Sequence, residues 1–248
     1  KRSLQRTRRA ELGYSTISLA DYTSAGNSSL FNALAGGVAR VGEGLFTTLS
    51  TTTRAVKLSN RKVLLTDTVG FIDRLPLTLI EAFHSTLEET ILSDIILLVV
   101  DISETEEDIE RKLRVCLDTI QAIGGSSVPV VTTFNKTDLL SESELNQKMT
   151  NIKNLAPEPV PVSALFKTNI SSLEQKILGH LEPLLQASFS IPLESQHSSF
   201  ISWLFSRAEV KSQKYEGDRV HVVFEAVPWF ADKVRERVIQ LGGEFQET

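Results

Sequence analysis

Apolar residues follow two different spacings between residues 14 and 186. Short runs of β-branched and aliphatic residues predict strands, and segments with helical spacing separate them. We expect strands at residues 15 to 20, 54 to 58, 62 to 66, 94 to 100, 128 to 134 and 159 to 162. This alternation is typical of an α/β fold with a mostly parallel, six-stranded sheet. A short turn joins the second and third strands, so we expect these two to form an antiparallel hairpin.

The longest helical pattern follows the fourth strand. Apolar residues recur every three or four positions from Ile109 to Ile123, which places them on one face of a helix that ends at Gly124. Cys116 lies on this face. We therefore interpret it as a core residue and not as a nucleophile.

The pattern changes after residue 186. Residues 187 to 198 are rich in Ser, Pro, Gln and His without periodicity, and we interpret them as a linker. Residues 199 to 248 predict a small α-β-β-α module whose last helix begins at Pro228. Two folded parts, residues 14 to 186 and 199 to 248, would then follow a basic segment at residues 1 to 13.

Composition excludes several classes of protein. The single cysteine cannot form an internal disulfide, which favours a reducing compartment, and we expect a cytoplasmic protein. The apolar stretches are far shorter than the roughly 20 residues of a membrane span. The chain begins with Lys1 and its only methionine is Met149, so we expect a fragment of a longer protein.

The net charge of −5 conceals a basic start, because residues 1 to 9 carry five basic residues and no acid. This segment is either an arm that faces RNA or a solvated stretch of no special role, and the sequence alone leaves both open.

The turn after the first strand resembles the phosphate-binding motif GxxxxGK[ST]. Gly26 and Ser28 match the second glycine and the hydroxyl that ligates magnesium. Asp21 stands where the first glycine is expected, and Asn27 stands where a lysine would reach the outer phosphates. Taken alone, this loop is equally typical of an ordinary strand-turn-helix connection.

Two further segments supply the expected metal and γ-phosphate contacts. Asp67 ends the third strand and begins a DxxG sequence, in which Asp holds Mg²⁺ through water and the amide of Gly70 contacts a γ-phosphate. A Thr-rich segment precedes this strand. In it Thr53, or alternatively Thr52, would ligate Mg²⁺ and order the loop when the γ-phosphate is present. A merely flexible loop is the alternative.

The fifth strand delivers an NKxD sequence at its carboxyl end, where ligands of open α/β sheets bind. Asp138 can accept hydrogen bonds from N1 and N2 of guanine, which adenine lacks, and the stem of Lys136 can lie against the base. After the sixth strand, the backbone from Ser163 to Leu165 can close over the base. Four motifs in this order on these elements predict a guanine-nucleotide site.

The run from Asp67 to Thr90, DTVGFIDRLPLTLIEAFHSTLEET, together with LFTTLSTTTR at 45 to 54, resembles the HflX family of translation-associated GTPases. The similarity covers residues 14 to 186. The later run EVKSQKYEGDRVHVVFEAV is similar to the C-terminal module of many members. The basic start resembles the end of the helical linker that precedes the G domain in this family, so we expect the family's N-terminal domain to be missing.

This resemblance implies a P-loop, Ras-like G domain that binds GTP, GDP and Mg²⁺ and hydrolyses GTP to GDP and phosphate. It also implies association with the large ribosomal subunit, through its RNA and proteins, in splitting or rescue of ribosomes. No DNA or membrane partner is expected.

The resemblance also assigns roles by position. The expected phosphate-loop contacts are Asp21, Ser24, Ala25, Gly26, Asn27, Ser28 and Ser29. The expected metal ligands are Ser28, Thr53 and Asp67, and the expected catalytic contacts are Gly70 and Thr53. The expected base contacts are Asn135, Lys136, Asp138, Ser163, Ala164 and Leu165.

Three positions depart from what hydrolysis requires. Phe71 follows Gly70 where many Ras-like GTPases have a glutamine that orients water, so unaided hydrolysis should be slow. A lost lysine-phosphate bond at Asn27 costs about 1.5 to 3 kcal/mol, and a carboxylate at Asp21 adds repulsion. We therefore expect impaired nucleotide binding. The alternative is a module that binds ribosome, RNA or protein without hydrolysis.

Overall fold

The computed structural model describes residues 13–22, 24–36, 52–59, 61–67, 90–193 and 198–247. The chain divides into two compact units, one of residues 16–181 and one of residues 182–248 with residues 1–15. In the described part of the chain, no helix is both long enough and apolar enough to cross a membrane.

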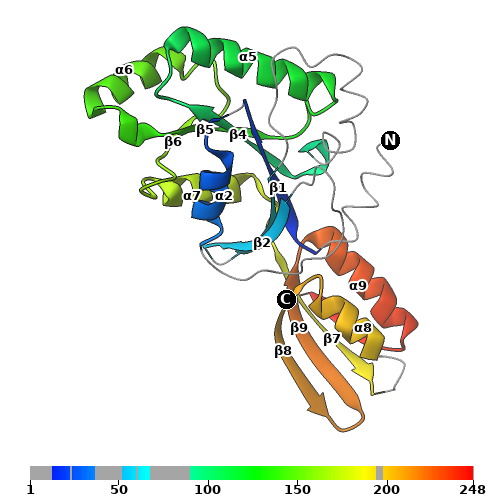
Figure 1. The fold of residues 1–248 in the computed structure, drawn as a ribbon. Helices are drawn as coiled ribbons and strands as arrows, with labels where there is room; N and C mark the ends of the chain where they lie inside the picture. The colour runs from blue at the N-terminus through cyan, green and yellow to red at the C-terminus, as the bar shows by residue number, and fades with distance from the viewer. Residues whose placement is uncertain are drawn as a thin grey trace. The chain divides into compact units, whose positions relative to one another are not determined.

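A six-stranded sheet with the order β2-β3-β1-β4-β5-β6 forms the centre of the first unit (Figure 1). Its strands are β1 (Ser15–Asp21), β2 (Thr52–Leu58), β3 (Arg61–Asp67), β4 (Ile95–Asp101), β5 (Val130–Asn135) and β6 (Val160–Pro161). β4 pairs in parallel with β1 and β5, and β5 pairs in parallel with β6. β2 and β3 form an antiparallel hairpin. The predicted fold class is confirmed, and strand ends differ from the prediction by at most two residues.

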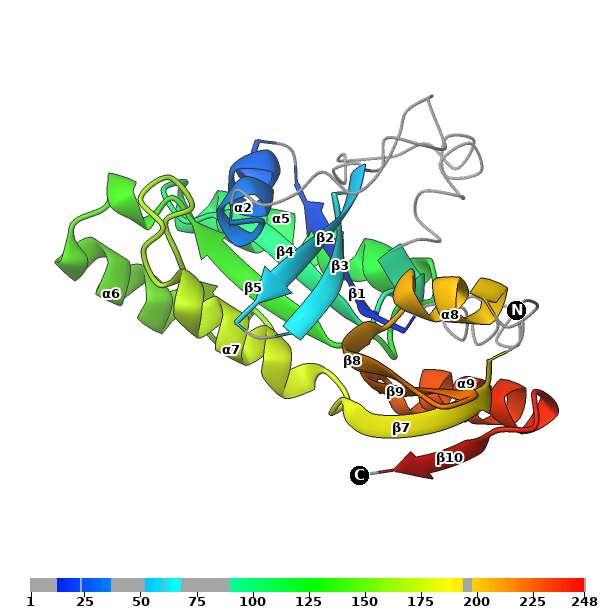
Figure 2. The same ribbon diagram turned by 90° about the horizontal axis from the view of Figure 1, so that it is seen from below.

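Helices cover both faces of this sheet (Figures 1 and 2). They are α2 (Asn27–Leu34), α5 (Glu106–Ala122), α6 (Glu142–Ile152) and α7 (Ile170–His180), with a short 3₁₀ helix η1 (Thr137–Leu139). α2 and α7 pack against one face, and α5 and α6 pack against the other. Every residue of β4 is buried, as expected for a central strand covered on both sides.

Cys116 lies on the buried face of α5. Burial raises the pKa of its thiol to about 12, so the thiolate is not formed at neutral pH. Its interpretation as a core residue is confirmed.

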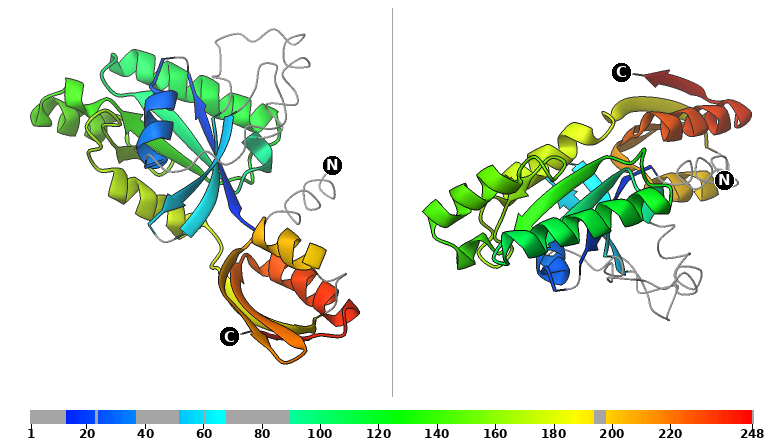
Figure 3. Two further views of the ribbon diagram at one scale, coloured as in Figure 1. Left: turned by 60° about the horizontal axis from the view of Figure 1, so that its bottom comes forward. Right: turned by 90° about the horizontal axis from the view of Figure 1, so that it is seen from above.

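The second unit is a four-stranded sheet with the order β10-β7-β9-β8 and two helices on one side (Figure 3). Its elements are β7 (Leu185–Pro192), α8 (Ser198–Phe205), β8 (Glu209–Glu216), β9 (Arg219–Ala226), α9 (Pro228–Gln240) and β10 (Glu244–Glu247). The order along the chain is β-α-β-β-α-β, and the strand pairs are antiparallel. As predicted, Pro228 begins the last helix.

The expected linker at residues 187 to 198 is wrong, because most of it is strand. β7 pairs with both β9 and β10 and therefore lies inside the second sheet. Ala187, Phe189 and Ile191 are buried against the helices and alternate with Ser188 and Ser190. The short polar side chains of Ser188 and Ser190, at the alternate positions, concealed the strand pattern. The boundary between the two units lies after residue 181, and not after 186 as predicted.

Candidate nucleotide-binding site

The loop between β1 and α2 depends on a glycine at position 26. Gly26 has a φ of 94°, which is left-handed, and a Cβ added there would lie 2.5 Å from Nδ2 of Asn135. It occupies the N-cap position of α2 and provides no side-chain cap, so the first-turn N–H groups are open to an anion. Ser28 and Ser29 are exposed in this first turn. This geometry fits the phosphate-binding loop that the sequence predicts.

Asn135 ties this loop to the expected base-binding segment. Its Nδ2 donates to the carbonyl oxygen of Ala25 at 2.9 Å. Its Oδ1 accepts a hydrogen bond from the backbone N–H of Ala164 at 3.0 Å. The side chain is buried, so both bonds are shielded from water. The structure thus brings together three predicted segments, which follow β1, β5 and β6.

Asp138 is exposed at the surface in η1, which follows β5 and its last residue Asn135. Its Oδ1 accepts a hydrogen bond from the hydroxyl of Ser163, and that hydroxyl in turn accepts from the N–H of Phe166 at 3.2 Å. The carboxylate is thereby held toward the segment that follows β6. Leu165 in that segment is 73% exposed, so its side chain is accessible to a ligand.

Asp101, which the sequence analysis did not single out, fixes Lys136. The ammonium of Lys136 donates to Oδ2 of Asp101 at 2.6 Å, and Lys136 has a left-handed φ of 68°. Burial alone would raise the pKa of Asp101, but hydrogen bonds from Lys136 and Ser103 outweigh it and hold the pKa below its usual range. Asp101 ends β4 beside Asn135 of β5, and this register was the signal available in the sequence.

The phosphate end of the site contains an amide and two carboxylates. Nδ2 of Asn27 donates to Oδ1 of Asp67 at 2.8 Å. The pKa of Asp21 is raised to about 6, mainly by burial and secondly by the nearby charge of Asp67, against the hydrogen bond from the N–H of Ala25. Burial also raises the pKa of Asp67, against the hydrogen bond from Asn27. No positive side chain takes the place of the missing lysine among the described contacts of Asn27.

Thr53 lies in β2, opposite Thr66 of β3. The two hydroxyl oxygens are 3.0 Å apart and hydrogen bonded. Its role as a magnesium ligand remains a prediction. Several predicted features lie outside the described residues, namely Gly70, Phe71, the threonines before Thr52 and the basic residues 1 to 9.

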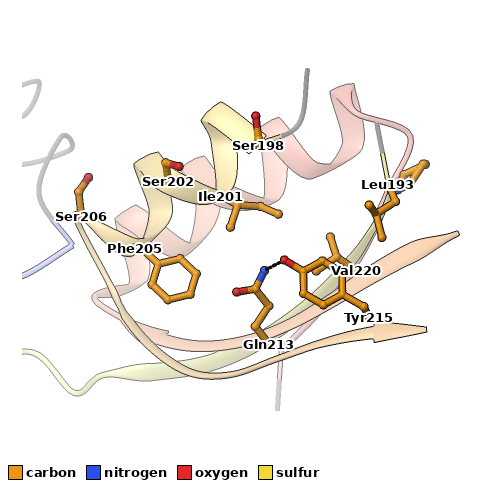
Figure 4. A pocket seen from close by; sticks show the side chains of 10 residues that line it. Leu193, Ser198, Ile201, Ser202, Phe205, Ser206, Gln213, Tyr215 and Val220 are labelled. Atoms are coloured by element: carbon orange, nitrogen blue, oxygen red, sulfur yellow. Dashed lines mark hydrogen bonds between the residues drawn. The ribbon is translucent and has the colours of Figure 1, made fainter. Parts of the chain in front are cut away.

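A pocket of about 690 Å³ lies in the other unit, between α8 and the strands β8 and β9 (Figure 4). Its lining includes Leu193, Ile201, Phe205, Gln213, Tyr215 and Val220. Among the described residues, its lining includes no charged side chain and none of the predicted site residues. It therefore does not change the assignment of the nucleotide site.

Known proteins match this chain over most of its length. A family model described as "50S ribosome-binding GTPase" matches residues 16–136. A protein of Methanocaldococcus jannaschii named "GTPase HflX" is 37% identical over 219 residues, which are 88% of this chain and 53% of that protein. A protein of Thermococcus kodakarensis with the same name is 41% identical over 186 residues, or 75% of this chain and 41% of that protein. The chain belongs to the HflX family. It spans about half the length of the curated relatives it matches.

Solved structures agree with this family assignment. A GTP-binding protein of Sulfolobus solfataricus in complex with GDP is 29% identical, with a TM-score of 0.54 over 72% of this chain and 55% of that one. Era of Aquifex aeolicus, 23% identical with a TM-score of 0.52, supports the fold alone.

The raised pKa of Asp21 predicts a specific effect on stability. The folded chain holds this proton up to about pH 6, whereas the unfolded chain loses it near pH 3.8. The stabilising contribution is therefore complete at low pH and is lost as the pH rises through 6. A shift of roughly 2 pKa units corresponds to about 3 kcal/mol. Asp21→Asn should raise the free energy of unfolding by about 1 to 3 kcal/mol at pH 8 and change it little at pH 4.

Urea unfolding in EDTA at pH 4, 6 and 8 measures this effect. The matched control is Asp118→Asn, which makes the same change at an exposed position of α5 and should leave stability unchanged at all three values. If the free energies of unfolding of the Asp21→Asn variant and the unmodified chain differed by the same amount at all three pH values, the raised pKa of Asp21 would be contradicted.

Proposed function

We propose that this chain binds guanine nucleotides, hydrolyses GTP to GDP and phosphate, and associates with the large ribosomal subunit. The observation that carries the nucleotide assignment is the pair of hydrogen bonds made by Asn135. They join the loop after β1, the NKxD sequence and the segment after β6 near the carboxyl ends of their strands, which supports a nucleotide site there.

Selection of guanine rests on Asp138. A carboxylate accepts and does not donate, so it matches the two donors N1–H and N2–H₂ of guanine and finds no such pair on adenine. Ser163 occupies one carboxylate oxygen and orients the group, and the exposed position leaves the carboxylate accessible to a base. A buried or unanchored Asp would not select in this way.

The residues present also fit a nucleotide-bound Mg²⁺. The hydroxyl of Ser28 is exposed in the first turn of α2, and the carboxylate of Asp67 is tethered beside that turn by Asn27. Oxygen donors of this kind are the ligands that Mg²⁺ prefers. The ion would neutralise charge on the outer phosphates. The open N–H groups of α2 would hold the phosphate oxygens in place.

The ribosomal part of the proposal is supported by the family and by the charge of residues 1 to 9. The matched model describes ribosome-binding GTPases, and the curated relatives carry the HflX name. A basic segment at residues 1 to 9 offers charges of the sign that RNA phosphates attract.

A second candidate function is a module that binds its partner without turnover. The hydrogen bond from Asn27 to Asp67 favours it, because an amide at this place supplies no charge to a γ-phosphate. The buried carboxylate of Asp21 adds repulsion at the same place.

Base choice provides the first test. GTP should bind more tightly than ATP, and Asp138→Asn should weaken GTP by roughly ten- to a hundredfold, because the loss of hydrogen bonds to a charged group is of this size. The same variant should gain affinity for xanthosine triphosphate, whose position 2 carries an acceptor. Calorimetric titration with the three nucleotides measures both changes. Equal affinities for ATP and GTP in the unmodified chain would reject the guanine assignment.

Restoring the phosphate loop provides the second test, which separates the two candidate functions. Asp21→Gly with Asn27→Lys should tighten GTP binding at least tenfold and raise its turnover, since both changes add favourable charge at the phosphates. Asn146→Lys adds the same charge on exposed α6 and serves as control. An unchanged affinity in the restored chain would favour the non-hydrolysing module.

Cosedimentation with separated ribosomal subunits provides the third test. The chain should pellet with the large subunit and not with the small one, and the bound fraction should fall as salt rises if basic residues contact RNA. A non-hydrolysable GTP analogue should change binding of the restored variant more than that of the unmodified chain, because only a well-held γ-phosphate can order the Thr-rich segment. Failure of the restored variant to bind either subunit would reject the ribosomal role.

A further inference from the structure

The side chain of Lys136 ends in an ion pair at the expected base end of the site. Its ammonium donates to Oδ2 of Asp101 at 2.6 Å, and the side chain of Asp101 is only 9% exposed. Water screens a pair of this kind less than it screens a pair on the open surface, so the contact persists longer. The tip of the lysine is therefore fixed.

The carboxylate of Asp101 is itself held in place. Its Oδ1 accepts hydrogen bonds from the N–H of Ser103 at 2.9 Å and from the hydroxyl of the same residue at 2.5 Å. The ammonium of Lys148, which belongs to α6, donates to the carbonyl oxygens of Ile102 and Glu104 and so holds the loop that carries this serine. The position of the carboxylate is thus set by the chain itself.

The stem of Lys136 passes close to the loop between β1 and α2. A Cβ added at Gly26 would lie 3.8 Å from Cε of Lys136, which is ordinary van der Waals distance. The backbone of Lys136 is left-handed, and Asn135 before it is bonded to the same loop. About a third of the lysine side chain stays exposed. The stem is therefore fixed at both ends and still accessible to a ligand.

We propose that Asp101 is a positioning residue for the nucleotide, because its pairing with the ammonium of Lys136 holds the lysine stem in place for the face of the base. The proposal rests on the guanine-nucleotide site of the proposed function and adds a residue that lies outside the four sequence motifs. Asp101 acts only through the lysine. A side chain that is ordered before the ligand arrives loses less freedom on binding, so affinity is higher.

Lys136 and Asp138 would contact different parts of a purine. A stem that lies against the face of the base contacts every purine in the same way, whereas Asp138 distinguishes the donors at the edge of guanine. Loss of the Asp101 carboxylate should therefore lower affinity without a change in base choice. Hypoxanthine separates the two effects, because it keeps the N1–H group of guanine and lacks the amino group at position 2.

Calorimetric titration of the full chain with GDP and with inosine diphosphate tests the proposal. Asp101→Asn keeps the shape of the side chain and removes its charge. It should weaken binding of both nucleotides by roughly two- to tenfold, which corresponds to the cost of ordering one long side chain on binding. The ratio of the two affinities should stay unchanged. If the substitution instead loosened the base end as a whole, Asp138 would lose its alignment and this ratio would fall.

Two further variants separate positioning from a structural role. Asp94→Asn is the matched control, because Asp94 precedes the other end of β4, where its carboxylate accepts from the N–H of Thr16 at 2.8 Å; GDP affinity should not change. Lys136→Met keeps an unbranched stem and removes the ammonium. When Asp101→Asn is added to it, GDP affinity should fall no further, because the contact through which Asp101 acts is already absent.

Circular dichroism of each variant establishes that it is folded, and the ratio of GDP to inosine diphosphate affinity keeps the test decisive if Lys136→Met does not fold. Three results would overturn the proposal and leave the guanine-nucleotide assignment intact: an unchanged GDP affinity in Asp101→Asn, a lower ratio, or an equal loss in the Lys136→Met background. Failure of the unmodified chain to bind GDP would instead reject the proposed function, and this proposal with it.

Discussion

One buried side chain sets the geometry of the whole candidate site. Asn135 donates to the phosphate loop and accepts from the segment after β6, so it fixes the separation of two loops that are 139 residues apart, from Ala25 to Ala164. The loop approaches so closely that a Cβ at Gly26 would overlap the amide nitrogen. The hydrogen bond from Asn135 to Ala25 therefore requires glycine at position 26. A larger residue there would displace the side-chain amide of Asn135 and leave its buried N–H group unpaired.

The two ends of the site have opposite electrostatic character. At the base end, Lys136 neutralises Asp101, and the pKa of that carboxyl lies below its usual range. At the expected phosphate end, the pKa values of Asp21 and Asp67 are raised, and the hydrogen bonds that oppose this rise come from uncharged groups, the N–H of Ala25 and the amide of Asn27. At the expected base end, the charge of Asp101 is therefore balanced within the chain. The phosphate end has an excess of negative charge where a polyphosphate would bind.

The sequence predicted the first unit well, because its central strands are rich in β-branched and aliphatic residues and lead into polar motifs. β4 is buried throughout and β5 leads directly to Asn135, so pattern and motif support each other. In the second unit, β7 was missed because Ser188 and Ser190 interrupt its apolar residues, although both belong to a regular two-residue alternation.

Side-chain contacts were less predictable than strands. Asp101 and Lys136 are 35 residues apart, and Asn27 and Asp67 are 40 apart, so only the sheet order brings each pair together. A sequence motif assigns a role to each residue by itself and does not show which other side chain that residue contacts. For this reason the motif identified Asn27 as the position of a missing lysine, whereas its hydrogen bond to Asp67 emerged only from the fold.

The two departures act together on the charge of the loop. With glycine at position 21 and lysine at position 27, one positive charge would face the carboxylate of Asp67. With Asp21 and Asn27, the loop has no cation, and it has two negative charges when Asp21 and Asp67 are both ionised. A divalent ion that arrives with the nucleotide would offset this charge, but it would not reproduce the hydrogen bonds of an ammonium to the outer phosphates. Binding of a nucleotide in this loop should therefore depend on cation concentration more steeply than in a loop with lysine, because the cation must offset the charge of the protein as well as that of the ligand.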